Sequence, residues 1–186
     1  MTRKAISEET LKEVPHGGLE AQFDDHDLTG WLGSFLGDWY ERLTSKRPLV
    51  GNPGTTALPL GKNDVRIAIL GDRGTNLHGA PRCAQSILDT TPLYDVVLHL
   101  GDVYHAGDTD EVKARFLDPW PRAPGARSLA LDSNHEMYSG GAGYVDLTLP
   151  AFQQESSYFA YQTDHFVLVG LDTGYDEYGL AGNQDG

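Results

Sequence analysis

The chain has 186 residues, with 14 lysines and arginines against 27 aspartates and glutamates, and its formal net charge is −13. This acidity argues against nucleic-acid binding through general electrostatics, because such surfaces need Lys and Arg in patches. Its single cysteine excludes an intramolecular disulfide framework. No apolar run approaches the roughly 18 residues of a membrane helix. The start of the chain lacks the apolar core of a secretory signal. We therefore expect a cytoplasmic protein without a membrane partner.

Residues 1–63 are predicted to form an N-terminal extension. Residues 7–13 are compatible with a short helix. Over residues 28–43, apolar side chains recur at helical spacing and predict an amphipathic helix. We expect this helix to dock on the main domain, with a partner-binding or membrane-surface helix as the alternative. Residues 46–63 are rich in Pro and Gly, which is typical of a connecting loop.

Residues 64–186 are predicted to form one domain in which strands and helices alternate. Strands are predicted at residues 65–70, 96–100 and 127–131, helices at 80–90 and 108–117, and a hairpin or two adjacent strands at 157–161 and 166–171. The second helix has a plausible capping pair in Asp108 and Glu111. This alternation predicts an α/β fold with a largely parallel central sheet.

Three of the predicted strands are followed by polar residues of similar type. Asp72 and Asp102 each follow a glycine at a strand end, and Asn134 and His135 follow the third strand. Ligands of open α/β sheets bind beyond the carboxyl ends of the strands, so we expect these four side chains at one edge. Carboxylate, amide and imidazole groups suit Mn, Fe and Zn. Three unrelated turns are the alternative, because an Asp after a strand is often only a turn residue.

The sequences around these residues resemble those of a known family. The stretches GDRG (71–74), GDVYH (101–105) and SNHE (133–136) resemble the motifs of the calcineurin-like metallophosphoesterases. Their flanks resemble a bacterial cytoplasmic branch similar to purple acid phosphatases, from about residue 27 onward. The resemblance implies an α/β/β/α sandwich of metallophosphoesterase type, incomplete at the C-terminus. It also implies hydrolysis of phosphate mono- or diesters by a metal-activated water at a dinuclear site.

The resemblance assigns roles residue by residue. It implies two divalent or trivalent metal ions, of Mn, Fe or Zn. Asp72 matches a ligand of the first metal, Asp102 the ligand that bridges both, and Asn134 a ligand of the second. His135 matches the catalytic histidine near the leaving group, as proton donor or charge stabiliser. A dinuclear site of this kind clamps phosphoryl oxygens and lowers the pKa of a bound water.

Some positions depart from the family pattern. His105 stands where the related phosphatases have a metal-binding Tyr, and we assign it as a metal ligand. Tyr104 is the alternative ligand, and a third possibility is that both residues only pack. Ser133 replaces the Gly before Asn134 and would cost energy if the backbone there needs a positive φ. Arg73, inside the first motif, is assigned to substrate phosphate, with a solvated loop Arg as the alternative.

The largest departure is the lack of late histidine motifs. After His135 the sequence holds one further histidine, His165, whereas the family completes both metal sites with late histidines. We therefore expect the chain to be the N-terminal part of a longer enzyme. The alternative is a truncated or inactive metallophosphoesterase-like scaffold with weak or no turnover. A nucleotide-binding loop at residues 71–76 is disfavoured, because neither GK[ST] nor GxGxxG follows the strand.

Other candidate residues receive structural interpretations. We expect His99, inside a predicted strand, to be a core histidine, and His78 to lie on the surface. Cys83, in a predicted helix, is interpreted as a small buried apolar residue. Asp172, at a strand end, is expected to bond nearby backbone rather than a metal.

Overall fold

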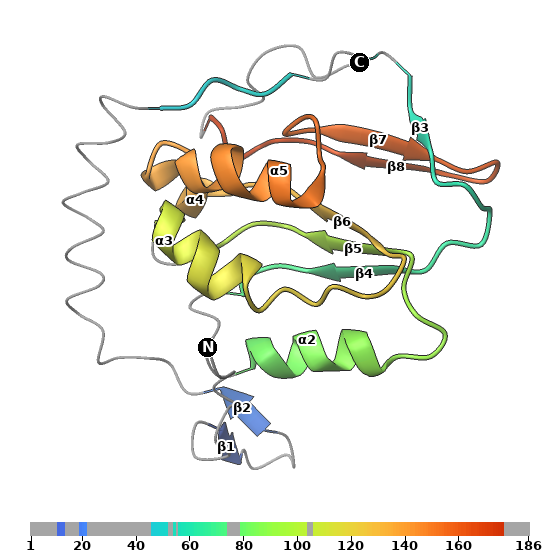
Figure 1. Ribbon diagram of the computed structural model, residues 1–186, viewed down its shortest axis with the longest axis horizontal. Coiled ribbons are helices and arrows are strands. Elements are labelled where there is room, and N and C mark those ends of the chain that lie inside the picture. Colours follow the sequence, from blue (N-terminus) through green and yellow to red (C-terminus); the bar gives the residue numbers. More distant parts are fainter. Residues whose placement is uncertain are drawn as a thin grey trace.

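The computed structural model describes residues 11–13, 19–21, 46–51, 54, 56–73, 79–103 and 106–176, and shows a mixed α/β fold (Figure 1). The predicted helix over 28–43 lies outside these residues, and so do His78, Tyr104 and His105. Within the described ranges, no helix is both long and apolar enough to cross a membrane. The proposed domain boundary at residue 63 stays a prediction.

Three parallel strands form the sheet that positions the candidate site. They are β4 (Ile67–Leu70), β5 (Val96–His99) and β6 (Arg127–Ala130), in the order β4-β5-β6. Leu70 pairs with His99, and His99 pairs with Ala130. This register brings the carboxyl ends of all three strands to one edge, and it confirms the predicted parallel sheet.

A second sheet contains β3 (Leu58–Pro59), β7 (Phe159–Gln162) and β8 (Val167–Gly170), in the order β3-β7-β8. Strands β7 and β8 are antiparallel, which confirms the predicted hairpin, and β3 is parallel to β7. The segment 46–63 therefore contributes a short strand where we expected only a loop. Strand pairing supplies hydrogen-bond partners for its backbone groups.

Near the start of the chain, β1 (Leu11–Glu13) pairs antiparallel with β2 (Leu19–Ala21). The predicted helix over 7–13 is therefore wrong for residues 11–13. Those three residues contain a single apolar side chain, Leu11, which is too little pattern to distinguish a strand from one helical turn.

The helical elements are α2 (Ala80–Asp89), α3 (Thr109–Glu111), the π-helical η2 (Val112–Leu117), α4 (Asn134–Tyr138), the π-helical η3 (Gly143–Thr148) and α5 (Leu149–Phe152). The carboxylate of Asp108 accepts a hydrogen bond from the Glu111 N–H at 2.8 Å, which confirms the predicted cap. Helix α2 buries Ala84 and Ile87. Cys83 is exposed, so its expected burial is wrong. Neighbouring residues lie about 100° apart around a helix, so Cys83 lies to one side of Ala84, at the edge of the buried stripe.

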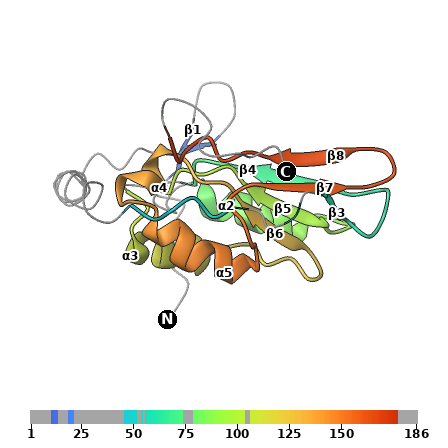
Figure 2. The same cartoon turned by 90° about the horizontal axis from the view of Figure 1, so that it is seen from above.

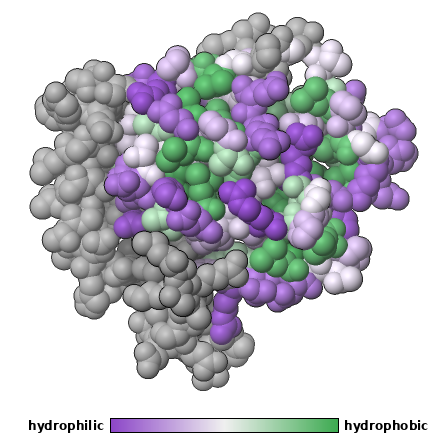
Figure 3. Space-filling view, viewed as in Figure 1, coloured by the Kyte–Doolittle hydropathy of each residue, from purple (hydrophilic) through white to green (hydrophobic). Residues whose placement is uncertain are grey.

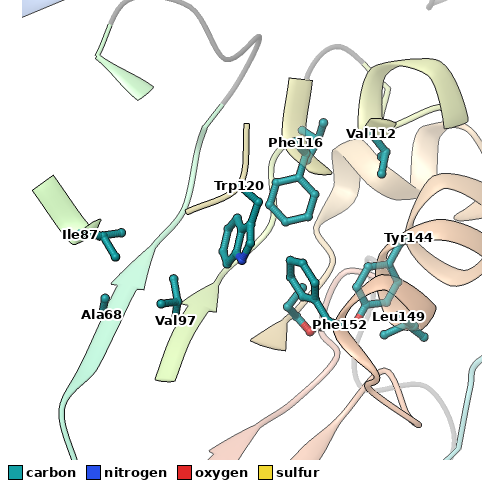
Figure 4. Packing of buried hydrophobic residues seen from close by; sticks show 11 residues of the cluster. Ala68, Ile87, Val97, Val112, Phe116, Trp120, Tyr144, Leu149 and Phe152 are labelled. Atoms are coloured by element: carbon teal, nitrogen blue, oxygen red, sulfur yellow. Dashed lines mark hydrogen bonds between the residues drawn. The ribbon is translucent and has the colours of Figure 1, made fainter. Parts of the chain in front are cut away.

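One face of the parallel sheet is covered by helices. Figure 2 shows α3 and α5 together on this side of the strands. The rings of Phe116, Trp120 and Phe152 pack against one another (Figure 4), with the Trp120 centroid 5.0 Å from that of Phe116 and 4.9 Å from that of Phe152. Ala68, Val97 and Ala130 of the sheet belong to the same buried cluster. Such aromatic clusters supply much of the apolar area that stabilises a domain.

The other face of the parallel sheet packs against the second sheet. Here a second buried cluster joins residues of β5 and β6 to β7: Val96, Leu98, Leu129, Phe159 and Tyr161. Strands covered on both faces show near-continuous apolar runs, which explains the pattern of β5. Coverage is incomplete elsewhere, since Ile69 is 59% and Val169 is 57% exposed. On the face seen in Figure 3, apolar side chains lie in separate patches between polar ones.

Candidate functional site

The three loops that follow β4, β5 and β6 lie against one another. The N–H of Asp72 donates to the carbonyl of Gly101 at 3.1 Å. The N–H of Asp102 donates to the hydroxyl oxygen of Ser133 at 3.1 Å. Each bond joins neighbouring loops in strand order, so the loops form one continuous edge. The structure thus brings together the backbones of Asp72, Asp102 and the residue before Asn134.

Two of the predicted metal ligands have a strained backbone conformation. Asp72 has a φ of 50° and Asp102 a φ of 72°, and among the described non-glycine residues only Gln153 joins them at positive φ. Side chains rarely adopt this left-handed region, although Asp tolerates it better than most. Strain of this kind concentrates at functional sites, where the surrounding structure maintains it. The two outliers therefore mark the ends of β4 and β5 as a candidate site.

Ser133 begins helix α4 and does not carry the expected strain. Its φ is −133° and its ψ is −174°, an extended conformation that any residue adopts. Its hydroxyl oxygen accepts a hydrogen bond from the His135 N–H at 3.1 Å, and Glu136 completes a capping box. Ser is a preferred residue at this position because its oxygen satisfies a free N–H of the first turn. The substitution of Gly by Ser therefore supplies a helix cap.

Glu136 links the loop after β5 to the loop after β6. Its side chain is 3% exposed. The carboxylate accepts from the N–H of Val103 and of Ser133, both at 2.8 Å, and from the Ser133 hydroxyl at 2.6 Å. A longer bond of 3.3 Å comes from the Asp102 N–H. Burial raises the pKa of Glu136, and the hydrogen bonds from Ser133 and Val103 act in the opposite direction. Sequence reasoning gave Glu136 no role of its own, although the S-x-x-E spacing of a capping box was visible.

Asn134 and His135 lie in the first turn of α4. Asn134 is exposed, and its amide nitrogen donates to the Tyr138 hydroxyl at 2.7 Å, which leaves the amide oxygen to act as a ligand. His135 is half-buried, and its ring meets the Tyr138 ring edge-on with centroids 5.1 Å apart. One helical turn therefore carries both a potential metal ligand and a potential proton donor, and Tyr138 orients both.

Arg73 lies in the interior beside the first loop. It is 4% exposed, its guanidinium lies 5.7 Å from the Trp120 ring centre, and it donates to the Pro119 carbonyl at 3.4 Å. Burial lowers the pKa of Arg73 to about 10. The alternative of a solvated loop arginine is therefore wrong. Contact between Arg73 and a substrate phosphate stays a prediction.

His99 is a core histidine, as predicted. It is 1% exposed at the end of β5, and its ring centre lies 4.4 Å from that of Phe116. Its Nδ1 accepts a hydrogen bond from the Gly101 N–H at 3.2 Å. Burial lowers the pKa of His99 to about 3, and the nearby charge of Arg73 adds to the effect. At neutral pH the ring is therefore uncharged and helps to hold the turn that leads to Asp102.

Two buried acids lie behind the candidate site. Asp132 is 4% exposed, and its carboxyl oxygens have no hydrogen-bond partner within the part of the chain that the structure describes. Asp172 is 1% exposed and accepts from the Tyr175 N–H at 2.9 Å, which confirms its expected bond to backbone. Burial and the charge of Asp172 raise the pKa of Asp132 to about 9. The pair of buried acids therefore holds a proton more readily than an exposed carboxyl group does, and differs in this respect from a pair of anionic ligands.

The described side chains at this edge include oxygen donors of the type that metal ions accept. Asp72, Asp102 and Asn134 offer carboxylate and amide oxygens at one edge, which suits Mn or Fe. Their set is incomplete, because the described residues contain no group of three or more His, Cys, Asp and Glu placed to hold a metal ion. The predicted ligand His105 lies outside the described residues. His165 is exposed in the turn between β7 and β8.

The end of the β7–β8 hairpin that lies opposite its turn approaches the candidate site. At Gly174, four residues after β8, a Cβ atom would lie 2.7 Å from the Cα of Ser133. The carboxyl end of β8 therefore reaches the same edge as β4, β5 and β6. His165, at the opposite end of β8, is separated from this edge by the length of the strand.

No protein-family model, curated protein or solved structure matches this chain. The resemblance to metallophosphoesterases therefore rests on the three motifs, and the structure adds that their loops meet at one edge of the parallel sheet.

Proposed function

We propose that this edge is a metallophosphoesterase-type site and that the chain hydrolyses phosphate mono- or diesters with the help of bound metal ions. The observation that carries the proposal is the pair of left-handed aspartates, Asp72 and Asp102, at neighbouring strand ends joined through Gly101. The proposal includes an α/β/β/α sandwich as the finer description of the fold. The helix-covered parallel sheet packed on the β3-β7-β8 sheet supports three of its four layers.

Asp102 is the carboxylate best placed to serve two metal ions. Its loop lies between the other two, because Gly101 accepts a bond from Asp72 and Asp102 itself donates to Ser133. Asp72 would hold one ion from one side, and Asn134 the other ion from the opposite side. When bound, such ions lower the pKa of a coordinated water and neutralise charge on the phosphoryl oxygens.

His135 is proposed to donate a proton to the leaving group. It follows Asn134 directly in the first turn of α4, and its backbone N–H is held by the Ser133 hydroxyl. The edge-on Tyr138 ring restricts the imidazole orientation. A leaving alkoxide needs such a donor close to the metal ligands, because general acid catalysis requires the two groups within hydrogen-bond reach.

A scaffold without turnover is the second candidate. It is favoured by the histidine count, because the one histidine after His135 is His165, which is exposed at the far end of the β7–β8 hairpin.

The test compares the hydrolysis of p-nitrophenyl phosphate and bis(p-nitrophenyl) phosphate with and without added Mn²⁺, Fe²⁺ or Zn²⁺. We expect turnover that depends on added metal. Asp102→Asn should lower kcat/KM at least about 100-fold, because a lost metal ligand removes several kcal/mol of charge stabilisation. Asn tolerates the left-handed backbone, so this variant isolates the loss of the carboxylate.

Asp110→Asn, on the exposed surface of α3, is the matched control and should keep kcat/KM within about twofold, as surface substitutions away from such features generally have small effects. Turnover that persists in metal-free protein would contradict the proposal, as would wild-type activity and metal content in Asp102→Asn. No turnover with any of the three metals would favour the inactive scaffold.

A further inference from the structure

The carboxylate of Glu136 receives hydrogen bonds from two separate loops. From the loop after β5 it accepts the N–H groups of Val103, at 2.8 Å, and Asp102, at 3.3 Å. From the loop after β6 it accepts the N–H and the hydroxyl of Ser133, at 2.8 and 2.6 Å. A capping box needs only the bonds within the second loop. The bonds to the first loop go beyond helix capping.

Glycines allow the loop after β5 to bend around the start of α4. A Cβ at Gly101 would lie 2.7 Å from the Cβ of Ser133, and a Cβ at Gly107 would lie 2.6 Å from the Cα of Glu136. Both glycines have positive φ, 97° and 60°. This close approach requires glycine at both positions, because real Cβ atoms do not pack at such distances. Glu136 therefore lies inside a fitted bend of the loop that carries Asp102.

A buried carboxylate is unfavourable unless hydrogen-bond donors surround it, and here the donors are backbone groups of the two loops. If the acceptor is lost, the N–H groups of Val103 and Ser133 lose their partner inside the protein. The two loops are then held less firmly in their relative position. Groups that orient metal ligands through hydrogen bonds typically change metal affinity about 10- to 100-fold when they are removed.

We propose that Glu136 is a positioning residue that couples the loop of Asp102 to the loop of Asn134 and so fixes the spacing of these two side chains. The metal-binding consequence rests on the proposed function, whereas the coupling of the loops does not. The coupling can therefore be measured without metal.

Glu111 provides a matched control. It is also a buried carboxylate, 9% exposed, and it also accepts a backbone N–H from the segment after β5, that of Ala106 at 2.9 Å. It forms an ion pair with Arg115 at 2.8 Å on the same helical segment. Replacing Glu111 by Gln therefore removes a buried carboxylate near the site without removing the bonds at Glu136.

The experiment measures backbone amide exchange by NMR in metal-free protein, and Mn²⁺ affinity by titration, for the wild type, Glu136→Gln and Glu111→Gln. Gln has nearly the same volume as Glu but turns an amide nitrogen toward N–H donors. Because Gln keeps one acceptor oxygen, we expect amide exchange to accelerate at least about tenfold in Glu136→Gln at Val103 or at Ser133, whichever faces the amide nitrogen. The Kd for Mn²⁺ should rise about 10- to 100-fold. Glu111→Gln should leave both quantities within about threefold of the wild type, because Glu111 binds Ala106 and Arg115 and has no bond to Val103 or Ser133.

Glu136→Asp distinguishes the bond to the loop after β5 from the bonds to the loop after β6. It also replaces Glu136→Gln in the experiment if that variant does not fold. The shorter side chain keeps its charge and its neighbour Ser133, but no longer reaches Val103. We expect faster exchange at Val103 with little change at Ser133.

Each outcome tests either whether Glu136 couples the two loops or whether it positions the metal ligands. Unchanged exchange at Val103 in both variants would overturn the coupling. A wild type that binds Mn²⁺, with Glu136→Gln binding it equally well, would overturn the positioning role. A wild type that binds no Mn²⁺ would instead contradict the proposed function, and the exchange rates would still decide whether Glu136 couples the loops.

Discussion

The helix-covered face of the parallel sheet and the edge at its carboxyl end adjoin each other but are built differently. The face is apolar, with the rings of Phe116, Trp120 and Phe152 in mutual contact. The edge consists of glycines, carboxylates and backbone N–H groups, and it contains two aspartates with left-handed backbone. Apolar packing stabilises the first region, whereas hydrogen bonds hold the second in a strained conformation. Substitutions in the apolar face should therefore change the stability, whereas substitutions at the edge should change metal binding.

The strongest test of this comparison removes the centre of the apolar face. Phe116 is 1% exposed and contacts both other rings. Phe116→Ala should lower the free energy of unfolding by about 3–5 kcal/mol, because it removes buried apolar area and leaves a cavity. Urea unfolding measures the change. The folded fraction should keep wild-type Mn²⁺ affinity. A loss below about 1 kcal/mol would show that the face is not the main source of stability.

A second test uses His99, where the two regions meet. Its pKa lies near 3 in the folded protein, against 6.5 for an ordinary histidine. The unfolded chain therefore binds more protons than the folded one between these values. The contribution of neutral His99 to stability is complete above pH 6.5 and is lost as the pH falls toward 3. The slope from this group is at most about 1.4 kcal/mol per pH unit.

His99→Asn removes the titrating ring and keeps an acceptor for the Gly101 N–H. Its free energy of unfolding should be lower than that of the wild type at pH 7, and the difference should narrow as the pH falls from 7 to 5. Urea unfolding at several pH values measures both proteins. Parallel pH profiles would show that His99 is not the group that loses stability in acid.

The smallest effect is expected outside both regions, on the outer side of β8. Val169 is 57% exposed, and Thr has nearly the same shape. Val169→Thr should change the free energy of unfolding by no more than about 0.5 kcal/mol, as exposed positions generally do. Thermal unfolding is sufficient to detect a larger change. A loss above about 1 kcal/mol would show that another part of the chain covers this side chain in solution.

The elements predicted most accurately were those with strong patterns. The apolar run of β5 identified a strand buried on both faces, and the Gly-Asp pairs correctly indicated strand ends at one edge. The buried or exposed state of single residues was harder to predict. Cys83 lies at the edge of the buried stripe of α2, four residues before the buried Ile87, so its helical spacing alone did not show that it is exposed. The alternative of a solvated Arg73 was wrong, because its side chain is buried near Trp120, a residue 47 positions away.

The candidate site was only partly predictable, because some of its contacts join residues that are distant in the sequence. The residue types of Asp72, Asp102 and Asn134 suggested metal ligands from the sequence alone. The role of Glu136 depends on four donors from two loops, and the distance between those loops is a property of the fold. Likewise, the extended backbone of Ser133 is determined by the start of α4, whereas its motif position suggested a glycine-like conformation.

The segment before β4 has a consequence for the order of folding. The described residues of the segment 47–63 contact partners far along the chain: Ser157 donates to the Val50 carbonyl, and Leu60 donates to that of Gln162. The strands of the parallel sheet, by contrast, pair with partners about 30 residues away, as Leu70 does with His99. During synthesis, residues 47–63 emerge from the ribosome some hundred residues before β7. Their contacts with β7 can form only after β4, β5 and β6 have been synthesised, so we expect this segment to close the structure last.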